Sequence, residues 1–200
     1  MTKKAFVLGI VSSFFVMFGC APMTTVVKVN VAYLPSDGPA KPQITTSKRI
    51  RIEPIVDKRW NIVLGEIKDE YGKSIGMYMS NTDVPKVITD AIKVELTNQG
   101  YQVVSEGGDL VLSGALLSLK GKRNKGWFLR GNFEAAAQAG LTLKDVSGNV
   151  IWSNVVNGHS ELKYGPLTKP NERFVETINS AIGDLIERLI GLESFRSALM

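Results

Sequence analysis

The chain has 200 residues, one cysteine and a formal net charge of +5. A single cysteine excludes an intramolecular disulfide framework, and this modest charge is not the basic footprint typical of a protein that binds nucleic acid. The length suits one folded domain with a sizeable hydrophobic core.

The N-terminal residues have the order of a secretory signal. Lys3 and Lys4 precede residues 5–18, which are uncharged and mostly apolar, and the small residue Gly19 follows. A positive start, a short apolar stretch and a small residue before the cut are typical of a signal peptide. A membrane-spanning helix would need about 20 mostly apolar residues. We therefore predict that residues 1–19 are a signal peptide.

The predicted cut falls before Cys20, the only cysteine of the chain. The segment Met17-Phe18-Gly19-Cys20 resembles the lipobox of bacterial lipoproteins, which implies a lipid on Cys20. Lipidation would also explain an odd cysteine in a secreted protein, and an ordinary signal peptide followed by a free thiol is the alternative. Each buried CH2 group contributes about 0.8 kcal/mol, so several acyl chains would hold the domain firmly at a membrane.

The residue after the cysteine predicts whether the protein is anchored in the inner or the outer membrane. In Gram-negative lipoproteins an Asp at this place usually means retention in the inner membrane, and here the residue is Ala21. This resemblance implies a lipid-anchored protein on the periplasmic face of the cell outer membrane.

Residues 20–47 are predicted to be the lipidated N-terminus and a tether. Four prolines within residues 22–42 exclude a regular helix there. Residues 25–34 are rich in β-branched side chains and predict a short strand laid on a sheet edge. The single folded domain is then expected over residues 48–200.

The elements of this domain follow from hydrophobic periodicity and from start and stop residues. Arg49, Arg51 and Glu53 alternate with apolar residues, which predicts a strand. Asp83 is typical of a helix start and Gly100 of a helix stop. In chain order we expect a strand at 48–56, a turn at 57–59, a strand at 60–67, a polar loop at 68–80 and a helix at 84–99. Strands at 101–104, 109–120, 132–144 and 150–162 follow, the last two joined by a hairpin turn at 145–149. A final helix is expected at 171–189, followed by a frayed or docked tail.

The order of these elements predicts the fold class. Adjacent strands joined by tight turns pair in antiparallel fashion, and each helix has an apolar stripe that a sheet would bury. The small residues of 132–144 also predict close packing under a helix. We therefore expect an α+β domain, with an antiparallel sheet covered on one face by two amphipathic helices.

Several of these landmarks together resemble the YajG-like family of bacterial lipoproteins. They are Gly19-Cys20-Ala21-Pro22, a β-rich patch at 24–31, Asp57-Lys58-Arg59 after a strand, Leu64-Gly65, Gln99-Gly100-Tyr101-Gln102-Val103 at a helix end, and Asp109-Leu110-Val111-Leu112. The likeness covers most of residues 20–200 and implies an envelope lipoprotein with no established catalytic role. Asp57 and Arg59 are expected to form an ion pair that fixes their turn.

The sequence offers no pattern for catalysis, a metal or a cofactor. His159 is the only histidine and Cys20 is expected to be lipidated, so a nucleophile beside a base is not indicated. No cluster of histidine, cysteine and carboxylate residues has ligand spacing. Residues 121–126, GKRNKG, lack the Lys-Ser/Thr ending of a phosphate-binding loop. We predict a protein that is not an enzyme and has no cofactor.

The sharpest local feature is a basic segment with two aromatic residues at a predicted hairpin tip. Such a segment suits an anionic surface, such as lipid head groups, lipopolysaccharide, peptidoglycan or an acidic protein. The alternative is a solvated tip with an aromatic ring folded back onto the core. The candidate contact residues are Lys120, Lys122, Arg123, Lys125, Trp127, Phe128 and Arg130.

The predicted function is that of an outer-membrane-anchored periplasmic lipoprotein with a binding or scaffolding role in the cell envelope. The alternative is an accessory subunit of an envelope transport, secretion or motility complex, in which an exposed sheet edge pairs with a partner's sheet. The predicted partners are the membrane, through the lipid on Cys20, and an envelope protein, lipopolysaccharide or peptidoglycan. Nucleic acid is not expected.

Overall fold

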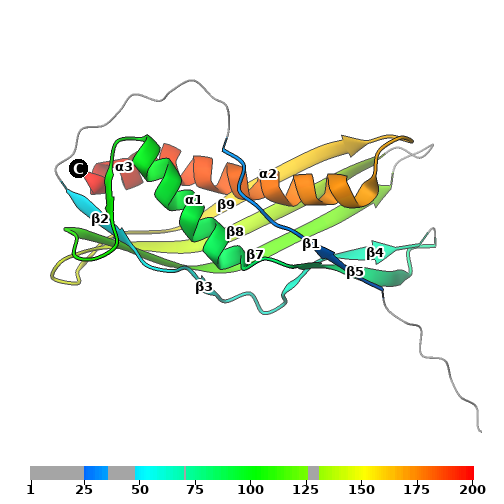
Figure 1. The fold of residues 1–200 in the computed structure, drawn as a ribbon, viewed down its shortest axis with the longest axis horizontal. Helices are drawn as coiled ribbons and strands as arrows, with labels where there is room; N and C mark the ends of the chain where they lie inside the picture. Colours follow the sequence, from blue (N-terminus) through cyan, green and yellow to red (C-terminus); the bar gives the residue numbers. More distant parts are fainter. Residues whose placement is uncertain (1–24, 36–47, 70, 126–130) are drawn as a thin grey trace, which may run out of the picture.

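The computed structural model describes residues 25–35, 48–69, 71–125 and 131–200, and it consists of a long mixed sheet, a small second sheet and three helices (Figure 1). The predicted fold class, α+β, is confirmed. The elements are β1 (Thr25–Val29), β2 (Arg49–Ile52), β3 (Val56–Asp57), β4 (Val63–Lys68), β5 (Ser74–Ser80), α1 (Val84–Asn98), β6 (Gln102–Val104), β7 (Leu110–Lys125), β8 (Gly131–Asp145), β9 (Val150–Tyr164), α2 (Pro170–Gly191) and α3 (Glu193–Leu199).

The main sheet has the strand order β6-β2-β7-β8-β9, with β3 paired to β7 beyond the end of β2. β7, β8 and β9 are antiparallel, as predicted, but β2 runs parallel to both β6 and β7. The reason is the crossover through α1, because a strand–helix–strand connection returns the chain to the end of the sheet where it began. The sheet is therefore mixed rather than wholly antiparallel.

The predicted turn at 145–149 closes the β8–β9 hairpin. The carboxylate of Asp145 accepts hydrogen bonds from the backbone N–H of Asn149 at 2.9 Å and from its side-chain amide at 3.0 Å. Gly148 has φ of 85°, a conformation that glycine adopts without steric cost. These contacts hold β8 and β9 in register.

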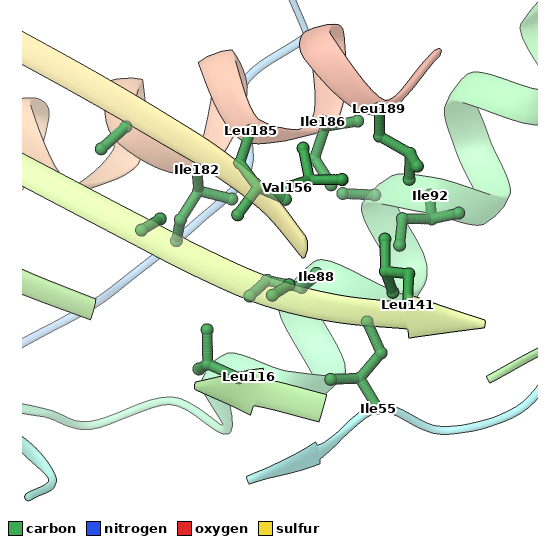
Figure 2. Close-up of a cluster of buried hydrophobic side chains, with 14 of the residues drawn as sticks. Ile55, Ile88, Ile92, Leu116, Leu141, Val156, Ile182, Leu185, Ile186 and Leu189 are labelled. Atoms are coloured by element: carbon green, nitrogen blue, oxygen red, sulfur yellow. The ribbon is translucent and has the colours of Figure 1, made fainter. Parts of the chain in front are cut away.

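Helices α1 and α2 cover one face of the main sheet, and their apolar stripes form the core with it. Figure 2 shows Ile88 and Ile92 of α1 facing side chains of α2 and of the sheet, such as Leu141 and Val156. The predicted close packing of small residues occurs at β8 and extends to β9. A Cβ atom on Gly158 of β9 would lie 2.1 Å from the backbone oxygen of Ala181 in α2.

The C-terminal segment is docked, not frayed. Phe195 and Leu199 of α3 are fully buried. The ring of Phe195 lies 4.8 Å from that of Trp152 in β9, and the indole N–H of Trp152 donates a hydrogen bond to the hydroxyl of Ser194 at 3.2 Å. Two apolar side chains three to four residues apart on a short helix are enough to fix it against the sheet.

The small sheet has the strand order β1-β5-β4 and includes a strand that the sequence did not predict. The expected loop at 68–80 is wrong over Ser74–Ser80, which forms β5. This strand pairs with β4 through a turn in which Asp69 accepts hydrogen bonds from the backbone N–H groups of Tyr71 and Lys73. Its other partner, β1, is distant in sequence, and this long-range pairing has no local signal.

Residues 25–35 pack against the folded domain. The predicted edge strand in this segment is confirmed as β1, and Val29 and Val31 are buried. The backbone N–H of Ala32 donates a hydrogen bond to the side chain of Asn179 at 3.0 Å, and the hydroxyl of Tyr33 donates one to Glu95 at 2.7 Å. Burial, together with the neighbouring Glu95 carboxylate, raises the pKa of Tyr33. The rest of the predicted tether, residues 20–24 and 36–47, lies outside the described residues.

Candidate functional site

The candidate contact residues predicted from the sequence fall partly within the described chain. Lys120, Lys122 and Arg123 lie on β7 and are exposed. The predicted contact residues Trp127, Phe128 and Arg130, the side chain of Lys125, and the predicted lipidation site Cys20 lie outside the described residues. The structure therefore describes the base of the basic hairpin and not its tip.

Alternation along β7 divides its side chains between two faces of the sheet. Leu119 is fully buried, and a Cβ atom on Gly121 would lie 2.5 Å from the ring of Phe174 in α2. Both positions therefore face the helix. Because side chains alternate along a strand, Lys120 and Lys122 point to the opposite face, whereas Arg123 is on the helix side with Leu119 and Gly121.

A groove lies between this part of β7 and the small sheet. It encloses a cavity of about 310 Å³, with Asn61, Glu66 and Lys68 on one wall and Lys120, Lys122 and Arg123 on the other. Oε2 of Glu66 lies 3.5 Å from Nζ of Lys68, and both side chains are more than half exposed. We call this cavity the basic groove.

Few carboxylates oppose the positive charge of the basic groove. Within the described chain, neither Lys120, Lys122 nor Arg123 forms an ion pair. Glu134 lies across from Lys122 on β8, but its carboxylate accepts hydrogen bonds from Asn124 and Asn132. Four basic side chains and one acidic side chain line the groove, so its surface potential favours an anionic ligand.

Two glycines allow the strands to come close enough to form the groove. A Cβ atom on Gly65 of β4 would lie 2.7 Å from the backbone oxygen of Gly121 and 2.9 Å from the ring of Phe174. Neither position tolerates a larger residue without a shift of backbone or ring. Phe174 thus lies beneath the junction of β4 and β7 and supports both strands.

Arg123 is held in place by aromatic rings, whereas no such contact holds the two lysines in the part of the chain that is described. Its Nε atom donates a hydrogen bond to the hydroxyl of Tyr164 at 3.1 Å, and its guanidinium carbon lies 4.7 Å from the centre of the Tyr164 ring. The ring of Phe133 lies 5.8 Å from the same carbon. Cation–π contacts of this kind fix a guanidinium while leaving donors for another group.

The aromatic cluster under Arg123 joins the small sheet to the main sheet. Tyr78 of β5 stacks on Phe174 with ring centres 3.9 Å apart, and its hydroxyl donates a hydrogen bond to Asn171 at 2.7 Å. Burial raises the pKa of Tyr78, and the positive charge of Arg123 partly opposes this effect. These rings pack on the helix side of β4 and β7, behind the residues that line the groove.

The basic side chains of the groove are suited to binding anions. Lysine and arginine donate charged hydrogen bonds to phosphate or carboxylate groups. His159 lies on β9, where its backbone N–H donates a hydrogen bond to Asp184 at 2.8 Å. Among the described residues, no three of the histidine, cysteine and acidic side chains are placed to hold a metal ion.

The predicted ion pair of Asp57 and Arg59 is confirmed and is more buried than its sequence context suggested. Nε and Nη2 of Arg59 donate hydrogen bonds to the two carboxylate oxygens of Asp57 at 2.9 and 2.7 Å. The Arg59 side chain is only 6% exposed. The hydrogen bonds from Arg59 hold the pKa of Asp57 below its usual range, although burial opposes them. This pair fixes the chain between β3 and β4.

Sequence reasoning found one wall of the basic groove and missed the other. Lys120, Lys122 and Arg123 were noticed because they are concentrated along the chain. Asn61, Glu66 and Lys68 come from the β3–β4 loop and from β4. Their approach to β7 depends on the Gly65–Gly121 contact, which no local pattern indicates.

The comparisons with known proteins concern the fold. No protein-family model matches the sequence, and no curated protein matches it. A solved structure from Xanthomonas campestris, assigned to the family DUF330, is 13% identical, with a TM-score of 0.51, and the match covers 86% of this chain and 96% of that one. This likeness shows a shared fold.

A second solved structure, a minor lipoprotein from Acinetobacter baumannii, is 16% identical, with a TM-score of 0.45, and the match covers 78% of this chain and 96% of that one. Neither structure is described as a YajG-like protein, so that resemblance stays a prediction. Across the described residues, no helix has the length and apolar character needed to cross a membrane.

Proposed function

We propose that this chain is a lipoprotein anchored at the periplasmic face of the outer membrane, where it has a non-enzymatic binding role. The observation that carries the proposal is the order of residues 1–20, in which a positive start and an apolar stretch lead to Gly19 and the single Cys20. Acyl chains on Cys20 would anchor a domain that needs no spanning helix of its own.

The basic groove supports a binding role for the anchored domain. Its exposed lysines would meet phosphate or carboxylate groups at the membrane surface. Lipopolysaccharide, anionic phospholipid, peptidoglycan and acidic envelope proteins all carry such groups. A contribution of about 1 kcal/mol for each basic residue near an anionic membrane would make the contact cooperative with the anchor.

The anchor is tested by intact mass and cell fractionation of the wild-type chain beside Cys20→Ser. We expect the wild type in outer-membrane fractions, with the mass of residues 20–200 plus acyl chains. The variant should be absent from these fractions and should carry no acyl mass. A wild-type chain that is soluble and free of acyl mass would make Cys20 a free thiol and would overturn the proposal.

The groove is tested by charge reversal in the full chain, with Lys120→Glu and Lys122→Glu combined. The matched control combines Lys58→Glu after β3 with Lys144→Glu on β8, which reverses the same charge at exposed lysines that lie outside the groove and, within the described chain, form no ion pair. Binding to vesicles containing lipopolysaccharide and to purified sacculi is compared at two salt concentrations. We expect the groove variant alone to lose binding, and the loss to shrink as salt rises.

A second candidate function rests on the edge of the main sheet. β9 is a 15-residue strand, and no strand in the described chain pairs with its outer side. Two of its backbone N–H groups are used locally, by Asn154 at Val155 and by Asp184 at His159. The remaining edge could pair with a strand of a partner in an envelope complex. A stoichiometric partner crosslinked through β9 would favour this function.

A further inference from the structure

The outer face of the small sheet is more apolar than a solvated sheet face should be. Its inner face packs on the core through Tyr78 and Val27, so alternation places the residues between them outward. These outward residues are mostly apolar, although a sheet with one solvated face normally alternates with polar residues. They are Ile75, Met77 and Met79 on β5 and Val26 on β1, with Lys28 on β1 and Glu66 on β4 beside them. Glu66 forms an ion pair with Lys68, so its charge is compensated within the same face.

Three large side chains of this sheet are conspicuously exposed. Val26 is 47% exposed, Ile75 is 45% exposed and Tyr71, in the β4–β5 turn, is 87% exposed. Lys68 and Lys73 flank Tyr71 and are also exposed. An exposed cluster of apolar and aromatic residues beside lysines marks an interaction surface. We call these five residues the anchor-side surface.

The strand register places this surface at the point where the chain from Cys20 enters the fold. β1 runs parallel to β5, with Thr25 opposite Gly76, and β5 is antiparallel to β4. The start of β1 and the β4–β5 turn therefore lie at the same end of the small sheet (Figure 1). The turn projects beyond Thr25 at that end.

Chain length then limits how far this end can lie from the membrane. Only five peptide units separate Cys20 from Thr25, and a fully extended chain spans at most about 18 Å over that length. The β4–β5 turn extends from this same end of the small sheet. If Cys20 carries the lipid, this end of the sheet lies within about 18 Å of the lipidated residue, which is close enough for the turn and the adjoining outer face to reach the head groups.

We propose that the anchor-side surface contacts the bilayer that holds the lipid on Cys20, with Val26, Tyr71 and Ile75 at the level of the head groups. This inference rests on the proposed function, because it needs the anchor. A tyrosine ring suits the interface because one end is apolar and the other polar. Lys68 and Lys73 reach phosphate groups with their ammonium ends while their stems stay against apolar atoms.

The contact also orients the basic groove. Lys68 belongs both to the anchor-side surface and to the wall of the groove, opposite Lys122. The end of β7 and the start of β8 lie at the same end of the molecule as the β4–β5 turn (Figure 1). A bilayer on the anchor-side surface would therefore bring anionic head groups to the mouth of the groove.

Site-directed spin labelling of the lipidated full chain tests the contact. A thioether at Cys20 leaves the chain without a free thiol, so one introduced cysteine takes the label. Ile75→Cys and Tyr71→Cys probe the surface, and Val146→Cys in the β8–β9 turn, which is also exposed, is the matched control. Each protein is reconstituted in vesicles of phosphatidylethanolamine and phosphatidylglycerol. The measurement compares relaxation by oxygen, which concentrates in the bilayer, with relaxation by a water-soluble nickel chelate.

We expect the ratio of oxygen to nickel accessibility at positions 71 and 75 to exceed that at position 146 several-fold. Equal ratios at the three positions would overturn the inference. Acyl mass is measured on the same samples to separate the two proposals. If the chain carries acyl mass but the labels at positions 71 and 75 are no more accessible to oxygen than the control, only the proposed surface contact is wrong. If the chain carries no acyl mass, the proposed lipid anchor is wrong as well. The label at position 71 occupies an exposed turn, so it reports even if a change at Ile75 disturbs β5.

Discussion

The two sheets of this molecule differ in how their strands find partners. β7, β8 and β9 are consecutive in the chain and pair through hairpins, whereas β1 pairs with β5 only after β2, β3 and β4 have intervened. Local pairing has a low loop-closure cost and a clear sequence pattern, and distant pairing has neither. We therefore expect the β7–β8–β9 part of the main sheet to be more stable than the small sheet, whose β1–β5 pair depends on the contacts that join it to α2 and β7.

Phe174→Ala is the substitution for which we expect the largest loss of stability. Phe174 is buried, stacks on Tyr78 and lies under both Gly65 and Gly121, so its removal leaves a cavity between the two sheets. We expect the free energy of unfolding to fall by about 3–5 kcal/mol. Urea denaturation measures the loss, and hydrogen exchange should show that β4 and β5 lose protection before β8. Leu167→Ala, at an exposed side chain, is the control. Uniform loss of protection across both sheets would contradict the comparison.

The next largest effect is expected on the main-sheet side, at Gly158. A Cβ atom there would meet the backbone oxygen of Ala181 at 2.1 Å and the backbone nitrogen of Leu185 at 2.5 Å. Backbone atoms cannot move aside as a flexible side chain can, so Gly158→Ala should lower stability by about 2–3 kcal/mol.

A matched glycine in the opposing helix should respond with the opposite sign. Gly183 of α2 has open space where its Cβ atom would lie. Gly183→Ala should raise stability by about 0.5–1 kcal/mol because alanine favours the helix. The same urea titrations measure both variants. Equal changes in the free energy of unfolding would show that the close approach of α2 to β9 does not determine which residue fits at position 158.

The Asp57–Arg59 pair lies where the chain passes from one sheet to the other, and Asp57→Asn should have an intermediate effect. The arginine is buried and the aspartate is partly exposed, so we expect a loss of about 2 kcal/mol, between the values for exposed and buried pairs. Combining Asp57→Asn with Arg59→Met removes the uncompensated charge and should recover part of the loss.

The same pair makes a prediction about pH. The pKa of Asp57 is lower in the folded state than in the unfolded state, because Arg59 donates hydrogen bonds to its carboxylate. Its contribution to stability is therefore complete above the unfolded pKa, near 4, and is lost as pH falls through the folded value. The difference in stability between wild type and Asp57→Asn should be constant at neutral pH and should shrink below about pH 4. A difference that persists in acid would mean that the carboxylate charge is not its source.

The sequence predicted the parts of the fold that have local signals. The α1 start at Asp83 and Pro85, the β8–β9 turn and the apolar stripe of α2 each follow from neighbouring residues, and each is present. Ser74–Ser80 was missed because its apolar residues lie on both faces, and because one of its partners, β1, is distant in the chain. The parallel pairing of β2 was missed for the same reason.

The candidate site likewise combines residues that have a local sequence signal with residues that do not. The basic residues of β7 are adjacent in sequence and were visible as a charge cluster, but Lys68 joins them only through the contact of Gly65 with Gly121. The burial of Arg59 was hidden as well, because exposure depends on packing that the sequence around it does not specify. The basic groove and the Asp57–Arg59 pair thus both depend on packing between distant segments.

The smallest expected effect on stability, and the sharpest contrast with Phe174, is that of Tyr71→Ser. The Tyr71 side chain is exposed in the β4–β5 turn, whereas Phe174 is buried and stacks on Tyr78 of β5 in the core. The turn is held by hydrogen bonds from backbone N–H groups to the Asp69 carboxylate, and serine preserves them. The free energy of unfolding in detergent should change by less than about 0.5 kcal/mol. If the ring instead packs on the fold, a loss above about 1 kcal/mol would appear in detergent, and the exposed tyrosine would have a structural role rather than one at the membrane.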